Sequence, residues 1–104
     1  MEKTISIADV QSLVMAENYY YSLHADLERK SDDLSFREIE EALLKGSILE
    51  SYPDTGRGSS CLIVGFSANK PIHVVCGYRG KSLVIITVYV PKPPKFTDPW
   101  TRGL

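Results

Sequence analysis

The chain has 104 residues, of which 43% are hydrophobic, 24% charged and 10% aromatic. Two separate cores would each fall near the size at which independent folding becomes marginal, so we expect one domain. This ordinary composition excludes collagen-like, coiled-coil and wholly disordered chains. Two cysteines are too few for a disulfide scaffold, and together with two histidines they show no zinc-finger spacing.

Hydropathy gives no sign of a membrane segment. The longest apolar stretch, Leu83–Pro91, is far shorter than the roughly 20 residues that a membrane helix needs. Asp9 and Gln11 interrupt the region where a secretion signal would need an apolar core. We therefore expect a cytoplasmic protein with no membrane contact, no metal and no cofactor.

Charge is distributed unevenly along the chain. Residues 1–52 hold five Lys or Arg against eleven Asp or Glu, a net charge of −6, whereas residues 53–104 hold seven against two, a net charge of +5. Such asymmetry is typical of a basic half that meets an anion or nucleic acid. It is equally typical of acidic helices and basic loops that keep a protein soluble. Charge by itself leaves both interpretations open.

The first half of the chain has the periodicity of helices. A capping-box pattern at Ser6 predicts a first helix, whose apolar positions are Ile7, Val10, Leu13 and Val14. A second helix is expected over about residues 23–30. Ser35 begins the third helix, Glu38 completes its capping box, and Gly46 supplies the C-terminal stop.

The second half has the pattern of strands. Four strands are expected, at residues 47–52, 60–66, 72–78 and 82–90, with a glycine-rich loop at 53–58 and short hairpin connections. The tyrosine run at 19–21 suits an extended or turn segment better than a helix. The prolines in residues 91–104 prevent a helix there, so we expect an extended tail with Trp100 as its anchor.

These elements predict an α+β fold in which N-terminal helices pack on one face of a four-stranded, mainly antiparallel sheet. Residues 1–90 are expected to form the single domain, and residues 91–104 a Pro-rich C-terminal tail.

Connection lengths predict the register of the sheet, because a slip of one residue turns a whole side-chain set to the other face. A four-residue loop at 67–70 places Cys61 opposite Cys76, and a three-residue loop at 79–81 places His73 opposite Thr87. One face is then wholly apolar and carries the helices: Cys61, Ile63, Ile72, Val74, Cys76, Val84, Ile86 and Val88. At those positions the two thiols are expected to be inert packing.

The opposite face is mixed, and its polar groups gather at His73, Thr87 and Tyr89. Its remaining members are Leu62, Val64, Val75, Leu83 and Ile85. This polar patch is either a functional site or a structural feature, in which His73 is hydrogen-bonded to a neighbour and only completes the sheet.

Several segments in order carry a family resemblance: His24-Ala25, Ser35 to Leu43, Gly46 to Pro53, Pro71 to Val75 and Ile86 to Tyr89. The set covers roughly residues 19–91. It resembles a family of small bacterial domains of unknown function that is similar to BrnT and, more distantly, RelE, the mRNA endonucleases of type II toxin–antitoxin pairs. The resemblance implies the α+β fold, RNA as a ligand and an antitoxin partner, in some members of the zinc-finger MqsA type. One departure from the family is Glu28, at a position where the family usually has arginine. Arg29 is one residue later, so its side chain points about 100° away from that position on a helix.

Metal-independent RNA cleavage needs a base for the 2′-hydroxyl, charge for the pentacoordinate phosphorane and a proton for the leaving oxygen. The residue types suited to these tasks predict catalytic roles for His24, His73, Arg57 and Tyr89. RNA contacts are expected from Thr87, Arg79, Lys81 and Arg29. The plainer alternatives are a backbone-bonded histidine at a helix start for His24 and a solvated loop side chain for Arg57.

The tail interleaves charge and rings at Lys92, Lys95, Phe96 and Trp100. Such a strip docks on nucleic acid through phosphate contacts and stacking, or folds back on this domain or on a second subunit of a homodimer. A single tryptophan near a terminus favours docking on protein. Two functions follow: a RelE/BrnT-like toxin, or a non-catalytic module that uses the same face for a protein or peptide.

Overall fold

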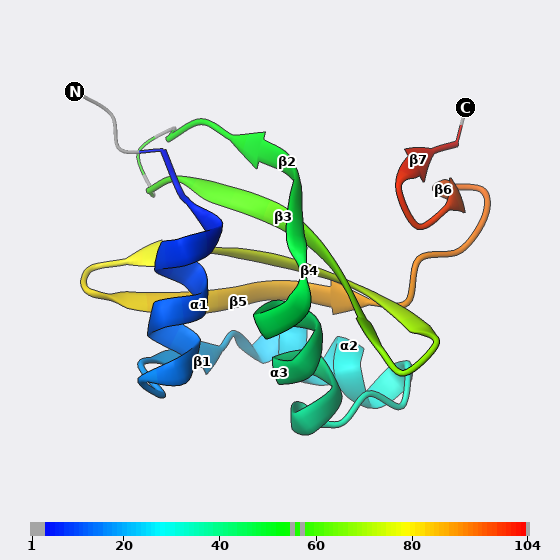
Figure 1. Cartoon of the computed structure of the whole chain (residues 1–104), viewed down its shortest axis with the longest axis horizontal. Helices are drawn as coiled ribbons and strands as arrows, with labels where there is room; N and C mark the ends of the chain where they lie inside the picture. Colours follow the sequence, from blue (N-terminus) through cyan, green and yellow to red (C-terminus); the bar gives the residue numbers. More distant parts are fainter. Residues whose placement is uncertain (1–3, 55, 57, 104) are drawn as a thin grey trace.

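The computed structural model describes residues 4–54, 56 and 58–103, in which three helices, a five-stranded sheet and a small C-terminal hairpin are arranged in layers (Figure 1). The helices are α1 (Ile7–Met15), α2 (Leu23–Ser31) and α3 (Phe36–Lys45). The sheet strands are β1 (Tyr19–Tyr21), β2 (Ser47–Tyr52), β3 (Ser60–Ser67), β4 (Lys70–Arg79) and β5 (Ser82–Tyr89). The hairpin pairs β6 (Phe96–Asp98) with β7 (Thr101–Arg102).

Each helix begins at a serine whose hydroxyl accepts a backbone N–H that the helix itself cannot satisfy. Ser6 accepts from the N–H of Asp9 at 3.1 Å, and Ser22 plays the same part for α2. At α3 the Glu38 carboxylate also accepts the N–H of Ser35 at 3.0 Å, which confirms the predicted capping box.

The sheet has the strand order β1-β5-β4-β3-β2, and all of its pairs are antiparallel except β1 with β5. The four expected strands are present, but the prediction of four was wrong because the tyrosine run at 19–21 adds a fifth. A three-residue strand is too short to show alternation. Its hydrogen-bond partner, residues 83–85 of β5, is also far away in the sequence.

All three helices lie on one side of the sheet (Figure 1). The buried core between the two layers includes Val10, Val14, Ala25, Ile39, Ala42, Leu43, Cys61, Ile63, Ile72, Val74, Cys76, Leu83, Ile85 and Val88. Gly65 lets α3 approach β3 closely, since a Cβ there would overlap the carbonyl oxygen of Ala42. No helix within the described ranges is long and apolar enough to cross a membrane.

The register between β3 and β4 agrees with the prediction, including Val64 opposite His73 and Cys61 opposite Cys76. The two cysteines are free and buried, and their Sγ atoms lie 4.0 Å apart. They belong to the core beneath the helices, as the expected face requires.

The predicted register between β4 and β5 was wrong. The turn has two residues rather than three, and a β-bulge interrupts the pairing between Val75 and Cys76, so His73 lies opposite Tyr89 instead of Thr87. Turn and bulge together shift the pairing by two residues at His73, which preserves the face of Thr87 and Tyr89. Between the turn and the bulge the pairing differs from the predicted one by a single residue, because only the turn contributes there. Leu83 and Ile85 therefore belong to the core, while Val84 and Ile86 face the other side.

The C-terminal tail folds back over the sheet face opposite the helices, which we call the second face. Phe96 is only 2% exposed, whereas Trp100 is 55% exposed and contacts Phe66 with a ring-centroid distance of 5.7 Å. The anchor of the tail is therefore Phe96 rather than Trp100 as expected. Arg102 in β7 makes two hydrogen bonds to the Glu50 carboxylate in β2, at 2.6 and 2.7 Å.

Candidate functional site

His73 lies on the second face, fully buried beneath the tail. Its Nε2 is 2.6 Å from the carbonyl oxygen of Pro99, which can only accept, so this nitrogen carries the proton. Burial lowers the pKa of His73, which favours the neutral ring. Nδ1 is then an acceptor, and the Tyr89 hydroxyl, 3.2 Å away, donates to it. Both nitrogens of His73 are thus used inside the protein.

The hairpin closes over this pair through ring contacts. Phe96 meets the His73 ring edge-on with centroids 4.4 Å apart, and the Arg102 guanidinium lies 5.0 Å from the Phe96 ring. The Arg102 guanidinium also lowers the pKa of Glu50 to about 2, with a further contribution from the Tyr52 hydroxyl. The packing of Phe96 on His73 and the ion pair between Arg102 and Glu50 therefore hold the tail over His73 and keep solvent away from it.

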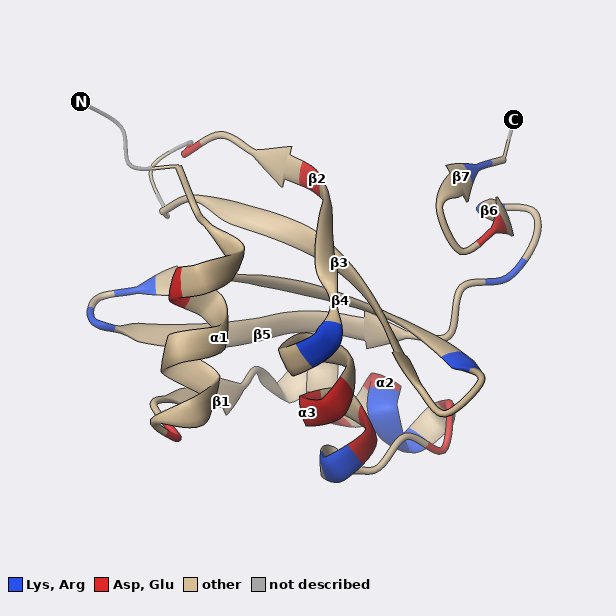
Figure 2. Cartoon of the chain, viewed as in Figure 1, with Lys and Arg blue, Asp and Glu red and all other residues tan. Residues whose placement is uncertain are grey.

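Between the tail and β5 lies a hollow of about 350 Å³, which we call the tail cleft. It is lined by Glu28, Thr87, Tyr89, Val90, Lys92, Pro93, Pro94 and Lys95. Lys and Arg residues lie along the tail and at the tip of the β4–β5 hairpin, and also in α2 and α3, whereas the middle of the sheet strands carries few charges (Figure 2). The cleft thus combines two lysines with a carboxylate, a phenol and a hydroxyl.

Helix α2 supplies one wall of the cleft because it covers the edge of β5 that β1 leaves open. The Glu28 and Asp32 carboxylates accept the backbone N–H groups of Val88 and Val90, at 3.1 and 2.9 Å. These bonds satisfy backbone N–H groups at the edge of β5 that could otherwise pair with a strand of another chain. They also place Glu28 where it faces the cleft.

Glu28 connects two of the predicted catalytic residues. His24, exposed at the start of α2, has its Nε2 3.3 Å from a Glu28 carboxylate oxygen. On the cleft side, burial raises the pKa of Tyr89, and the charge of Glu28 adds to this effect. Glu28 therefore contacts His24 and also shares the lining of the tail cleft with Tyr89.

The sequence indicates Glu28 only as a departure from the family that the chain resembles, and not as a residue of the site. The signal that could have found it is its spacing from His24, since residues four apart share one face of a helix. Lys92 and Lys95 were noted as tail charges. Their place beside Thr87 and Tyr89 depends on the fold of the tail, which no local pattern shows.

The other predicted RNA contacts lie elsewhere. Arg29 is held inside the helical layer, with its Nε donating to Asp26 at 2.8 Å and its guanidinium 3.8 Å from the Phe36 ring centroid. Arg79 ends β4 and Lys81 lies in the β4–β5 turn, at the opposite end of β5 from Tyr89 (Figure 1). Arg57 lies outside the described residues.

The fold and the site define a small α+β domain with helices on one face and a cationic cleft on the other. Residues 21–90 match the model of a domain of unknown function, DUF4258, and because this match spans more than half of the chain, the chain belongs to that family. The match includes His24, Glu28, His73 and Tyr89 and ends before the tail. No curated protein and no solved structure matches the chain.

Proposed function

We propose that this chain is the toxin of a type II toxin–antitoxin pair, a RelE/BrnT-like protein that binds RNA and cleaves it without a metal ion. The observation that carries the proposal is the tail cleft, whose lining brings Lys92 and Lys95 together with Tyr89 and Glu28. His24 lies outside this lining and is connected to it through its contact with Glu28. Cations for a phosphate and groups for proton transfer are the two things such cleavage requires.

We assign one role to each group in this scheme. Glu28 orients the His24 ring through Nε2, which leaves Nδ1 to take the proton of a ribose 2′-hydroxyl. The 2′-oxygen attacks phosphorus, the bond to the 5′-oxygen breaks, and an ammonium of Lys92 or Lys95 protonates the departing oxygen. The products are a 2′,3′-cyclic phosphate and a free 5′-hydroxyl. The remaining ammonium balances the charge of the phosphorane.

His73 acts as a positioning residue in this scheme. Because the Tyr89 hydroxyl donates to Nδ1 of His73, the phenol oxygen keeps its lone pairs for the 2′-hydroxyl of a bound ribose. Thr87, which also lines the cleft, supplies a further hydroxyl for a phosphate or sugar.

An antitoxin partner fits the exposed side of α2. Leu23 and Leu27, four residues apart, are 77% and 58% exposed, and Tyr20 in the neighbouring β1 is 47% exposed. Exposed apolar side chains that lie together mark protein contacts. The partner would be a small antitoxin, of the zinc-finger MqsA type, or a second copy in a homodimer.

These leucines, together with the internal use of both His73 nitrogens, also favour the second candidate function, a non-catalytic module that binds a protein or peptide. The two functions differ in what expression of the chain by itself does to a bacterial culture. A toxin arrests growth, whereas a binding module leaves growth normal at high levels of soluble protein.

The test therefore expresses the wild type and two variants without a partner. We expect the wild type to arrest growth and His24→Gln to relieve the arrest, with Arg37→Gln, an exposed change on α3, as the matched control. His24 is the sharper target because His73→Ala would also open a void beneath Phe96. Purified wild type should cleave single-stranded RNA in EDTA and leave cyclic phosphate ends. Normal growth and intact RNA would contradict the proposal.

A further inference from the structure

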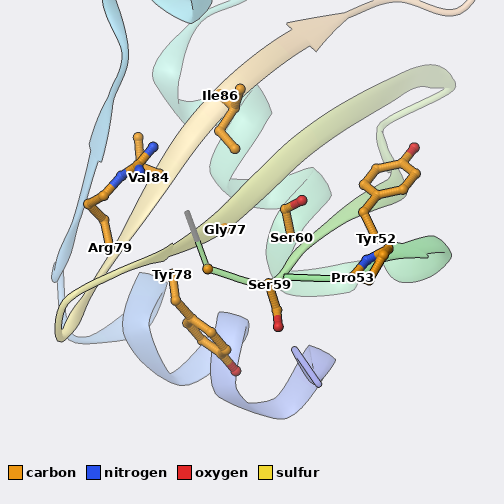
Figure 3. Close-up of a pocket in the computed structure, with 10 residues that line it drawn as sticks. Tyr52, Pro53, Ser59, Ser60, Gly77, Tyr78, Arg79, Val84 and Ile86 are labelled. Carbon is orange, nitrogen blue, oxygen red and sulfur yellow. The ribbon is translucent and has the colours of Figure 1, made fainter. Parts of the chain in front are cut away.

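A second hollow, separate from the tail cleft, opens at the hairpin end of β4 and β5 (Figure 3). Its volume is about 340 Å³, within the range of roughly 300–1,000 Å³ that small-molecule sites occupy. Its lining includes Tyr52, Ser60, Gly77, Arg79, Val84 and Ile86. We call it the sheet pocket.

Residues of β5 on the hairpin side of the β-bulge form the floor of this pocket. The two-residue turn and the bulge together set the register of this stretch, so that Val84 and Ile86 lie on the second face, away from the helices. Gly77 on the adjacent strand leaves this space clear, since a Cβ there would lie 3.0 Å from the Ser59 carbonyl oxygen and 3.1 Å from Cβ of Ser60. Val84 and Ile86 therefore give the pocket an apolar floor. Bulges often re-aim side chains beside functional sites.

The sheet pocket carries a positive charge, which comes from Arg79. Arg79 is exposed, and it forms no ion pair or side-chain hydrogen bond with another residue in the described part of the chain. Among the residues that line the pocket none is a carboxylate. A guanidinium without a protein partner is suited to a phosphate, which it holds through two parallel N–H bonds.

An aromatic ring completes the arrangement. Tyr52 and Arg79 lie at opposite ends of the pocket, with Ser60 and Ile86 between them (Figure 3). The Tyr52 hydroxyl donates to Glu50 at 2.7 Å, which holds the ring in place at the edge of the pocket. Stacking on tyrosine is how many proteins hold unpaired bases.

We propose that the sheet pocket binds one nucleotide, with its phosphate on Arg79 and its base on the Val84–Ile86 floor beside Tyr52. This inference rests on the proposed function, in which the nucleotide belongs to a single-stranded RNA whose scissile phosphate lies in the tail cleft. Ile86 and Tyr89 are three residues apart on β5, about 10 Å at the rise of a strand. One short stretch of RNA therefore reaches both sites.

The test measures nucleotide and RNA binding with the full chain. Uridine 5′-monophosphate should shift the backbone amide signals of Ser60 and Gly77, and uridine without a phosphate should shift them less at equal concentration. Arg79→Gln should weaken binding of this nucleotide and of a single-stranded oligouridylate by about tenfold, as expected for one lost charge-assisted contact. It should also reduce the slope of log affinity against log salt by about 0.7. Arg37→Gln is the matched control, and thermal unfolding confirms that both variants are folded.

The outcomes separate this inference from the proposed function. If Lys95→Gln weakens RNA binding while Arg79→Gln behaves like Arg37→Gln, the pocket assignment is wrong and the proposed function stands. If the nucleotide shifts Ser60 and Gly77 but no RNA is bound or cleaved, the pocket holds a nucleotide and the proposed function falls. If an acidic peptide shifts these signals and the nucleotide does not, the ligand class is wrong.

Discussion

Phe96→Ala tests whether the C-terminal hairpin belongs to the folded core. The ring is 2% exposed, lies edge-on to His73 at 4.4 Å and has the Arg102 guanidinium 5.0 Å from its centroid. Removing a buried phenylalanine costs roughly 3–5 kcal/mol, of which about 0.5–1.5 kcal/mol belongs to an aromatic pair. Because a hairpin near the chain end can relax onto the space left behind, we expect the lower end of that range. The predicted loss is about 3 kcal/mol, a large part of the roughly 5–15 kcal/mol that stabilises a domain.

The measurement is urea unfolding of wild type and variant, followed by circular dichroism at one pH. At roughly 4 °C for each kcal/mol, the melting temperature should also fall by about 12 °C. The control is Trp100→Ala, since Trp100 is 55% exposed and should cost about 1 kcal/mol or less. A loss for Phe96→Ala no larger than that of the control would refute the reasoning, because it would mean that the hairpin is undocked in solution.

Three further changes test other parts of the structure. Gly65→Ala should destabilise by about 3 kcal/mol or prevent folding, because the added methyl overlaps the Ala42 carbonyl; expression level and thermal unfolding report it. Asp32→Asn should cost about 1 kcal/mol in urea unfolding, because the N–H of Val90 exchanges a charged acceptor for a neutral one. Burial lowers the pKa of His73, so the unfolded chain takes up a proton more readily than the folded one. The stability present above about pH 6.5 should therefore fall as the pH drops toward 5, by at most about 1.4 kcal/mol per pH unit.

Each of these three predictions has a matched control. Gly80→Ala adds a methyl where no atom lies within 4 Å, so only its φ of +62° is unfavourable and the loss should be smaller than for Gly65→Ala. Asp33→Asn alters the exposed neighbour of Asp32, and an equal loss from both would show that the bond to Val90 contributes nothing. His24→Gln removes the other histidine. If it abolishes the pH dependence, the assignment to His73 is wrong.

How far the sequence predicts the site depends on how local each signal is. His73, Thr87 and Tyr89 could be placed on one face because strand alternation is a local property. The turn and the bulge each shift the pairing by one residue, and a total shift of two leaves the face unchanged. The partner of His73 could not be predicted, because a bulge has no reliable signature in a run such as Val84 to Val88, where almost every residue is apolar. The pocket floor at Val84 and Ile86 escaped prediction because the β4–β5 turn has two residues rather than the expected three.

The sequence by itself determined the helices with their serine caps, four of the five sheet strands, the β3–β4 register and most of the apolar face that receives the helices, with Val84 and Ile86 as the exceptions. These features follow from side-chain period, turn length and capping, which act over a few residues. Only the tertiary structure decided that β1 pairs with β5, that Glu28 and Asp32 cover the β5 edge, and that Phe96 closes over His73. Those contacts join segments far apart in the sequence. They form because an unpaired strand edge and an uncovered apolar face are costly to leave in water, whichever distant segment satisfies them.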